Sequence, residues 1–317
     1  MASALIGLPS DFSLPYFAYG ALKCEEIAWP QISGYVTATN PATAPGLKIA
    51  VIDGTAYAVP HLLGAISGDL MDFSNPEDAY AKIALFEGMY RRHPSYEWAV
   101  VQISGQSANI LRSPQPRQIA EFVNSWSVVD DPVFSHGLRW IRQELEPLAS
   151  RLPDGIHSYP QKSDYWSDYF RLQSLIAFQY SYHERVETYR LGATNEDKDS
   201  DSANPGVRRG MKNRRLEMSQ DPDFLRALEL AQIDRSFSIR GYRHPGSDGV
   251  SADRNPLESW YRVRSNIAHH GKGSEWELKK VLTVAVDHFN TLLEFVKITS
   301  PRLAETYKDL TQVKLER

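Results

Sequence analysis

Cysteine is almost absent from the 317-residue chain, which contains Cys24 alone. One cysteine cannot form an internal disulfide and rules out a cysteine-rich zinc site, so we expect no metal, no cofactor and a reducing, cytoplasmic environment. No apolar stretch approaches the ~18 residues needed to cross a bilayer. The start of the chain lacks a basic segment before its apolar residues, so neither a secretory signal nor a membrane partner is expected.

A strong net charge is also lacking, because 35 Lys and Arg face 39 Asp and Glu, which gives a net charge of -4. This balance excludes a chain that binds nucleic acid through its overall charge. Residues 1–127 hold 7 basic against 11 acidic residues, whereas the remainder holds 28 of each. Any nucleic-acid site must therefore be a local feature, and it is expected in the second part.

The first part of the chain has the pattern of a small α+β domain. Short β-branched and aromatic runs alternate with Gly, Pro and Asn, and Asp53-Gly54 is typical of a two-residue hairpin turn. Asn75-Pro76 precedes apolar residues at helical spacing, which predicts one helix within the strands. The expected strands are PYFAYGAL, ISGYVTAT, LKIAVIDGTAYAVP, LLGAISGDLMDF and YEWAVVQIS. We therefore expect a mixed β-barrel or α+β domain over residues 1–127.

The second part, residues 128–317, is predicted to be an all-α bundle. Apolar residues recur every three or four positions, which is typical of amphipathic helices that share a core. Residues 192–215 are polar and rich in helix breakers, so a mobile loop is expected there. Helices are predicted over 165–191, 224–233, 256–270 and 274–296.

The first chemical motif combines a small-residue turn with a carboxylate. Tyr19, Gly20, Ala21 and Leu22 follow a predicted strand, and such a turn can direct backbone N–H groups at an oxygen of a ligand. Glu87 stands before a glycine at the expected end of the helix, where its carboxylate can act as a general base. The motif predicts a small-molecule site.

This pair of motifs resembles the gamma-glutamylcyclotransferase-like family, whose members carry a YGSL-type loop and a catalytic glutamate before glycine. The resemblance covers about residues 14–112 and implies that the loop binds the substrate while Glu87 transfers a proton as 5-oxoproline forms. Ala21 stands where serine is usual, and Phe86 precedes the glutamate. Two alternatives therefore stay open, an active cyclotransferase and a pocket adapted to another small molecule.

The second motif lies on the predicted helix 256–270. Asn266 and His269 are three residues apart on one face, and the long side chain of Arg264 can reach the same cleft. An imidazole can move a proton at the 2'-hydroxyl of RNA while a guanidinium stabilises the phosphate charge, without a metal. Two alternatives stay open. Arg262 stands seven positions before His269, which also places the two on one helical face, and His270 can replace His269.

The string RSNIAHHG after WYRV resembles the HEPN family, especially its Apea-like members, which are defined by an arginine followed by a histidine. The resemblance implies a metal-independent endoribonuclease that acts as a homodimer. It also implies that the earlier long helix contributes a polar residue to the site, which is best matched by Glu184. A toxin or phage-defence role is expected by analogy. The target is RNA, with tRNA as one candidate.

A basic run precedes this motif and can line a path for RNA by contacting phosphates. The arginines expected to contact RNA are Arg208, Arg209, Arg214 and Arg215. The favoured hypothesis is a ribonuclease with a cyclotransferase-like sensor domain. The alternative is a cyclotransferase-like enzyme whose helical bundle serves dimerisation or nucleotide binding, and a third, weaker one makes both parts non-catalytic interaction modules.

Overall fold

The protein is described by a computed structural model that forms two compact units. Unit 1 comprises residues 1–135, 187–212 and 300–303, and unit 2 comprises residues 136–186, 213–299 and 304–317. The structure describes residues 7–90, 94–113, 121–151, 159–192, 214–233, 256–257, 260–261, 263–265 and 278–315. The mixed α+β class is confirmed, because unit 1 contains the sheet and the described residues of unit 2 are mostly helical.

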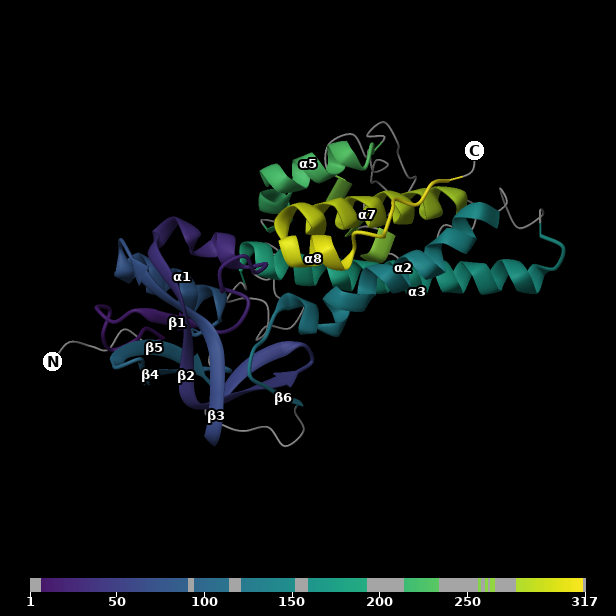
Figure 1. Ribbon diagram of the computed structural model, residues 1–317. Coiled ribbons are helices and arrows are strands. Elements are labelled where there is room, and N and C mark those ends of the chain that lie inside the picture. Colours follow the sequence, from purple (N-terminus) through teal and green to yellow (C-terminus); the bar gives the residue numbers. More distant parts are fainter. Residues whose placement is uncertain are drawn as a thin grey trace. The chain divides into compact units, whose positions relative to one another are not determined.

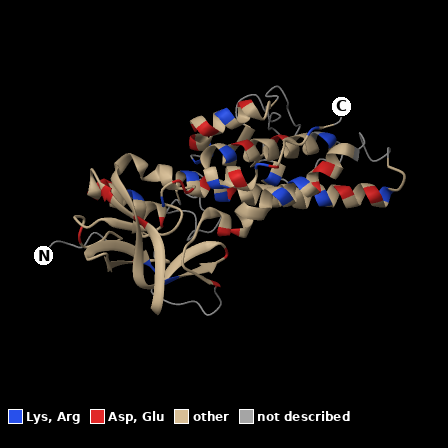
Figure 2. Cartoon of the chain, in the orientation of Figure 1, with Lys and Arg blue, Asp and Glu red and all other residues tan. Residues whose placement is uncertain are grey.

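Unit 1 is built around a curled sheet of six strands in the order β4-β5-β1-β3-β2-β6 (Figure 1). The sheet is mixed, because β1 pairs parallel to β5 and antiparallel to β3. The strands are β1 (Tyr16–Ala18), β2 (Val36–Ile52), β3 (Thr55–Phe73), β4 (Glu97–Ile103), β5 (Gln106–Arg112) and β6 (Glu121–Val123). Figure 2 shows that these strands carry few charged residues, in contrast to the helices.

The predicted turn at Asp53-Gly54 is confirmed, since it joins β2 and β3 with both residues at positive φ (49° and 75°). The expected separate strands before and after it are wrong, because β2 and β3 each run unbroken for 17 and 19 residues. Pro41 and Pro45 stay within β2, and the register shift between Pro45 and Leu47 absorbs the irregularity. Bulges of this kind bend the hairpin and curl the sheet.

The predicted helix after Asn75 is confirmed as α1 (Pro76–Phe86). Asn75 caps it by accepting a hydrogen bond from the Asp78 N–H, and Pro76 occupies the first turn, where no backbone donor is needed. The helix ends at Phe86, Glu87 is its C-cap residue, and Gly88 follows in the left-handed region with φ 68°. Tyr80 faces the core and donates its hydroxyl to the Leu14 carbonyl at 2.7 Å.

The remaining helices follow the apolar periodicity of the sequence. They are the short 3-10 helices η1 (Trp29–Gln31), η2 (Ser33–Tyr35) and η3 (Val128–Asp130), and the α-helices α2 (Pro132–Arg151), α3 (Lys162–Leu191), α5 (Pro222–Leu230), α7 (Leu278–Thr299) and α8 (Pro301–Thr306). The described residues within the predicted helix 256–270 are helical. Within the described ranges, no helix has the length and apolar content to cross a membrane. The predicted loop 192–215 lies mostly outside them.

Unit 2 buries polar rings among its helices. His183 of α3 and His288 of α7 have ring centroids 5.1 Å apart, and the His288 ring stacks on Trp260 at 4.2 Å. Gln179 donates to the Ala285 carbonyl at 2.8 Å, which ties α3 to α7. Burial, and then the neighbouring His183, lower the pKa of His288 well below its ordinary value. The core therefore requires a neutral His288.

Replacing Gly54 by alanine is expected to destabilise the protein more than replacing Gly105. Both glycines have positive φ (75° and 88°), so each alanine costs about 1–2 kcal/mol in backbone strain. A Cβ at Gly54 would also come within 2.5 Å of the Asp131 carboxylate, whereas one at Gly105 would meet nothing within 4 Å. Urea unfolding of both variants tests this. Equal losses of unfolding free energy would contradict a clash between the added Cβ at position 54 and Asp131.

Acid is expected to destabilise the protein through His288. The folded state disfavours the protonated ring, so below about pH 6.5 the unfolded chain binds the proton and stability falls by up to about 1.4 kcal/mol per pH unit. His288→Leu should reduce this slope between pH 7 and pH 5, while the same change at exposed His136 should leave it intact. The measurement is the unfolding free energy across this pH range. An unchanged slope in His288→Leu would refute the lowered pKa of His288.

Candidate functional site

The loop after β1 leaves backbone donors unused. Lys23 N–H donates to the Gly20 carbonyl at 3.1 Å and Ala28 N–H to the Ala21 carbonyl at 3.0 Å, which closes the chain into consecutive turns. Across the described residues, the N–H groups of Gly20, Ala21 and Leu22 reach no acceptor. All three residues line a cavity of unit 1, so the loop can offer hydrogen bonds to a ligand there.

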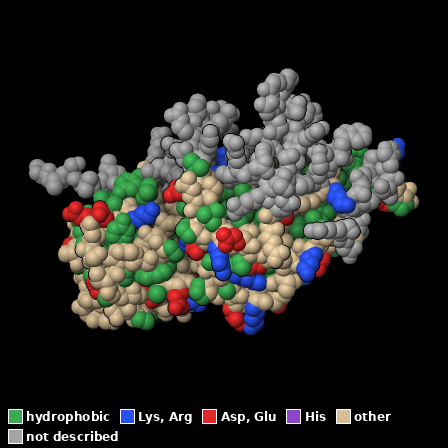
Figure 3. All heavy atoms as spheres, turned by 90° about the horizontal axis from the view of Figure 1, so that it is seen from above, with side chains coloured by type: hydrophobic (Ala, Val, Ile, Leu, Met, Phe, Trp, Pro, Cys, Tyr) green, Lys and Arg blue, Asp and Glu red, His purple; other side chains and the backbone are tan. Residues whose placement is uncertain are grey.

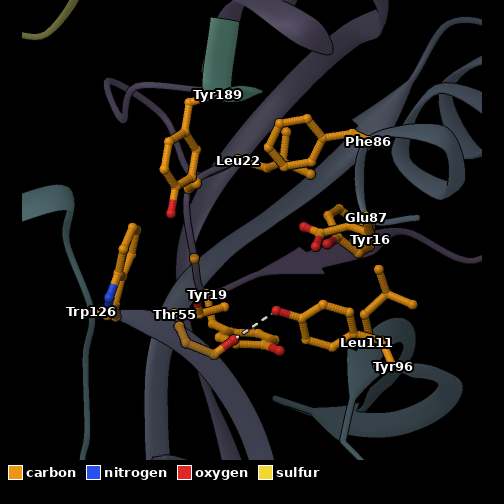
Figure 4. Close-up of a pocket in the computed structure, with 13 residues that line it drawn as sticks. Tyr16, Tyr19, Leu22, Thr55, Phe86, Glu87, Tyr96, Leu111, Trp126 and Tyr189 are labelled. Atoms are coloured by element: carbon orange, nitrogen blue, oxygen red, sulfur yellow. Dashed lines mark hydrogen bonds between the residues drawn. The ribbon is translucent and has the colours of Figure 1, made fainter. Parts of the chain in front are cut away.

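Glu87 lines the same cavity from the end of α1. Its N–H donates to the Ile83 carbonyl at 2.9 Å, and Gly88 then turns the chain away. Figure 4 shows the Glu87 carboxylate on the cavity wall beside Tyr16. Burial, followed by the charge of Glu87, raises the pKa of Tyr16 and Tyr96 well above the ordinary value, so both phenols stay protonated. The loop and the carboxylate of the first predicted motif therefore line one cavity.

The cavity has a volume of about 70 Å³, which is room for a small ligand group. Six of its lining residues are aromatic, and the others are small, aliphatic or polar. The lining consists of Tyr16, Tyr19, Gly20, Ala21, Leu22, Thr55, Ala56, Phe86, Glu87, Tyr96, Leu111, Trp126 and Tyr189.

Two of the tyrosines are fixed by their hydroxyl groups. Tyr19 accepts a hydrogen bond from the Ala58 N–H at 3.1 Å, and Tyr96 donates to the Ala56 carbonyl at 3.0 Å. Burial is the main cause that raises the pKa of Tyr19. Because these hydroxyls are tied to the backbone of β3, the rings form a rigid floor for the cavity (Figure 4).

Trp126 forms another wall and is only 2% exposed. Its indole N–H donates to the Gly54 carbonyl at 3.1 Å, and its own carbonyl accepts from the Lys23 ammonium. Two residues later, the Val128 N–H donates to the buried Glu26 carboxylate at 3.0 Å. The segment is thus fastened to the loop that carries Gly20–Leu22, so the two walls hold a fixed spacing.

Tyr189 completes the cavity from the end of α3, which unit 1 includes. Its ring packs edge-on against Phe134 at 5.4 Å and lies 6.5 Å from Phe86. Three lining residues, Tyr96, Trp126 and Tyr189, were not predicted from the sequence as site residues. Tyr96 adjoins a predicted strand, but Trp126 and Tyr189 carried no spacing signal, because they approach the loop only through the tertiary fold.

The second motif is placed only in part. Arg264 is half-buried in a helical stretch, with its guanidinium carbon 5.4 Å from the Tyr180 ring centroid. Glu184 lies one turn beyond Tyr180 on α3 and is also half-buried. The other members of this predicted site, namely Arg262, Asn266, His269 and His270, lie outside the described residues.

The basic run is likewise divided. Arg208 and Arg209 lie outside the described residues, and Arg214 is half-buried. Arg215 is only 8% exposed, and its guanidinium lies 3.8 Å from the ring centroid of Tyr261, which is a packing position. On the face drawn in Figure 3, basic and acidic side chains are interspersed, and the residues described there form no continuous basic surface.

Comparison with known proteins gives little guidance. No family model matches the chain, and no curated protein matches it. Among solved structures, the chain is similar to an uncharacterized protein, PH0828, from Pyrococcus horikoshii, at 16% identity. The match covers 39% of this chain and 98% of that protein with a TM-score of 0.31, a likeness too distant to support an argument.

Proposed function

We propose that the cavity of unit 1 is the ligand site of a gamma-glutamylcyclotransferase-like domain. One observation carries the proposal, namely that Glu87 and the unbonded amides of Gly20–Leu22 line a single cavity. Loop amides suit a carbonyl or carboxylate oxygen, and a carboxylate suits an amine. A ligand that carries both groups, as a γ-glutamyl amide does, fits this arrangement.

The chemistry that these residues support is an intramolecular acyl transfer. Glu87 removes a proton from the α-ammonium of the ligand, and the freed amine attacks the γ-carbonyl carbon while the loop amides stabilise the oxyanion. The bond to the leaving nitrogen then breaks as Glu87 returns this proton to it, and the attacking nitrogen passes its second proton through Glu87 to the departing amine, which leaves as an ammonium. The products are 5-oxoproline and the free amine.

Replacing Glu87 by glutamine is expected to lower 5-oxoproline formation from γ-glutamyl amides by about 10²–10⁴-fold, because the amide cannot accept the proton. Glu77→Gln is the matched control, since Glu77 is exposed in the first turn of the same helix. Chromatographic quantification of 5-oxoproline provides the measurement. Absence of product from the wild-type protein across γ-glutamyl amides would reduce the proposal to a binding site.

A second function is proposed for unit 2, that of a metal-independent HEPN endoribonuclease acting on RNA as a cytoplasmic homodimer. The position of Arg264 near the Tyr180 ring, with Glu184 one turn along α3, supports it, because both polar side chains belong to the helical unit. In this proposal, Arg264 stabilises the phosphate charge and His269 transfers the proton. Unit 1 then acts as a sensor, in the manner of a toxin or phage-defence effector.

His269→Ala is expected to abolish RNA cleavage that persists in EDTA, because the 2'-hydroxyl loses its proton acceptor. The assay incubates the full chain with tRNA and mixed RNA and analyses the ends for 2',3'-cyclic phosphate. His136→Ala, at an exposed position of α2, serves as the control. Cleavage that needs a metal, or that survives in His269→Ala, would exclude this mechanism.

A further inference from the structure

The longest helix of unit 2, α3, has an exposed face on which no residue is charged. From position 167 to position 181, the exposed residues recur every three or four positions, so they lie on one side of the helix. They are Ser167, Phe170, Ser174, Ala177 and Ser181. A helix that borders water usually carries charged side chains on its outer face, so this composition favours a protein partner.

Aromatic rings extend this face toward α2. Phe170 is 58% exposed, and its ring centroid lies 6.2 Å from that of Trp166. Trp140 of α2 is 41% exposed and packs edge-on against Phe178 of α3, with 4.7 Å between the ring centroids. Aromatic side chains are enriched at the centres of protein interfaces. We call the five exposed positions of α3, together with Trp140, Trp166 and Phe178, the α2–α3 face.

The two helices that carry the α2–α3 face are held side by side (Figure 1). Arg171 donates a hydrogen bond from Nε to the Glu144 carboxylate at 2.6 Å, which also offsets the charge that follows Phe170 in the sequence. At Gly137 the helices approach so closely that a Cβ would come within 2.9 Å of the Tyr182 ring. A surface fixed in this way loses little conformational entropy when it binds a partner.

We propose that two copies of this chain associate through the α2–α3 face, with their α3 helices antiparallel. A two-fold axis brings the same face of both copies together, so its large side chains must meet small ones. With the axis beside position 172, Phe170 of one copy lies against Ser174 of the other, and Ser167 lies against Ala177. Each exposed ring is then covered by a small residue, and no charge is buried along α3.

The size of this surface suits a stable dimer. A layer of two helices with the length of α2, 20 residues, is about 30 Å long and about 20 Å wide. Once the relief of the side chains is included, this is of the order of the about 800 Å² that each partner buries in a stable complex. The proposal names the contact surface of the homodimer proposed with the ribonuclease, but it requires neither proposed activity.

Phe170→Glu tests the face by sedimentation equilibrium of the full chain. It should raise the dimer dissociation constant by about 10²-fold or more, because each dimer loses two buried rings and gains two buried charges. Leu225→Glu is the matched control, since it adds the same charge at an exposed apolar position of α5 and should leave dimerisation unchanged. Wild-type protein that stays monomeric at micromolar concentration, or an equally strong dimer in Phe170→Glu, would overturn the proposal.

Thiol crosslinking tests the antiparallel pairing. Cys24→Ser removes the natural cysteine, and Ser167→Cys and Ala177→Cys then supply one thiol each in separate chains. In a mixture of the two variants, a short bismaleimide should join one variant to the other in preference to joining either variant to itself. More crosslinking within one variant than between the two would overturn the antiparallel pairing.

The outcome is separable from the ribonuclease proposal. A dimer that dissociates in Phe170→Glu supports the α2–α3 face whether or not the protein cleaves RNA. RNA cleavage by a protein whose dimer persists in Phe170→Glu would support the ribonuclease and remove this face as the dimer contact.

Discussion

The buried carboxylate of Glu26 holds together the parts of unit 1 on which its cavity depends. Its side chain is fully buried, accepts a hydrogen bond from Val128 N–H at 3.0 Å and forms an ion pair with Arg302 at 2.8 Å. The Lys23 ammonium lies 4.0 Å from a Glu26 carboxylate oxygen, and Lys23 directly follows the Gly20–Leu22 loop. A buried charge that loses a partner is strongly destabilising, so the loop and the segment after Trp126 are constrained as a set. The spacing of the cavity walls follows from this constraint.

Rigidity of this kind matters because the cavity is small. A ring displaced by one ångström would change the fit of a ligand group, and two of the lining tyrosines, Tyr19 and Tyr96, have their hydroxyls hydrogen-bonded to the backbone of β3. The site is preorganised, so little conformational entropy needs to be lost when a ligand binds. Its selectivity should therefore come from shape and charge rather than from closure of a loop.

Local chemistry made part of this structure predictable. Asp53-Gly54 required a turn, and Asn75-Pro76 and Gly88 bounded a helix that is capped at its C-terminal end by Glu87. The prolines of β2 misled the prediction, because the long strand continues through Pro41, which stays in register with Asp69, and through Pro45, which lies beside a bulge. Trp126 and Tyr189 could not be predicted as lining residues, because they reach the cavity through contacts between segments distant in sequence. The HEPN motif stays a prediction, because His269 lies outside the described residues.

Tyr189 links the cavity in the first part of the chain to a helix of the second part. The residue lies 62 positions beyond the predicted domain boundary at 127, yet it lines the cavity with residues of the first hundred positions. A polypeptide cut at that boundary would keep the sheet and lose one wall of the cavity. Recombination that exchanges the helical part for an unrelated one would therefore change which molecules the first part can hold.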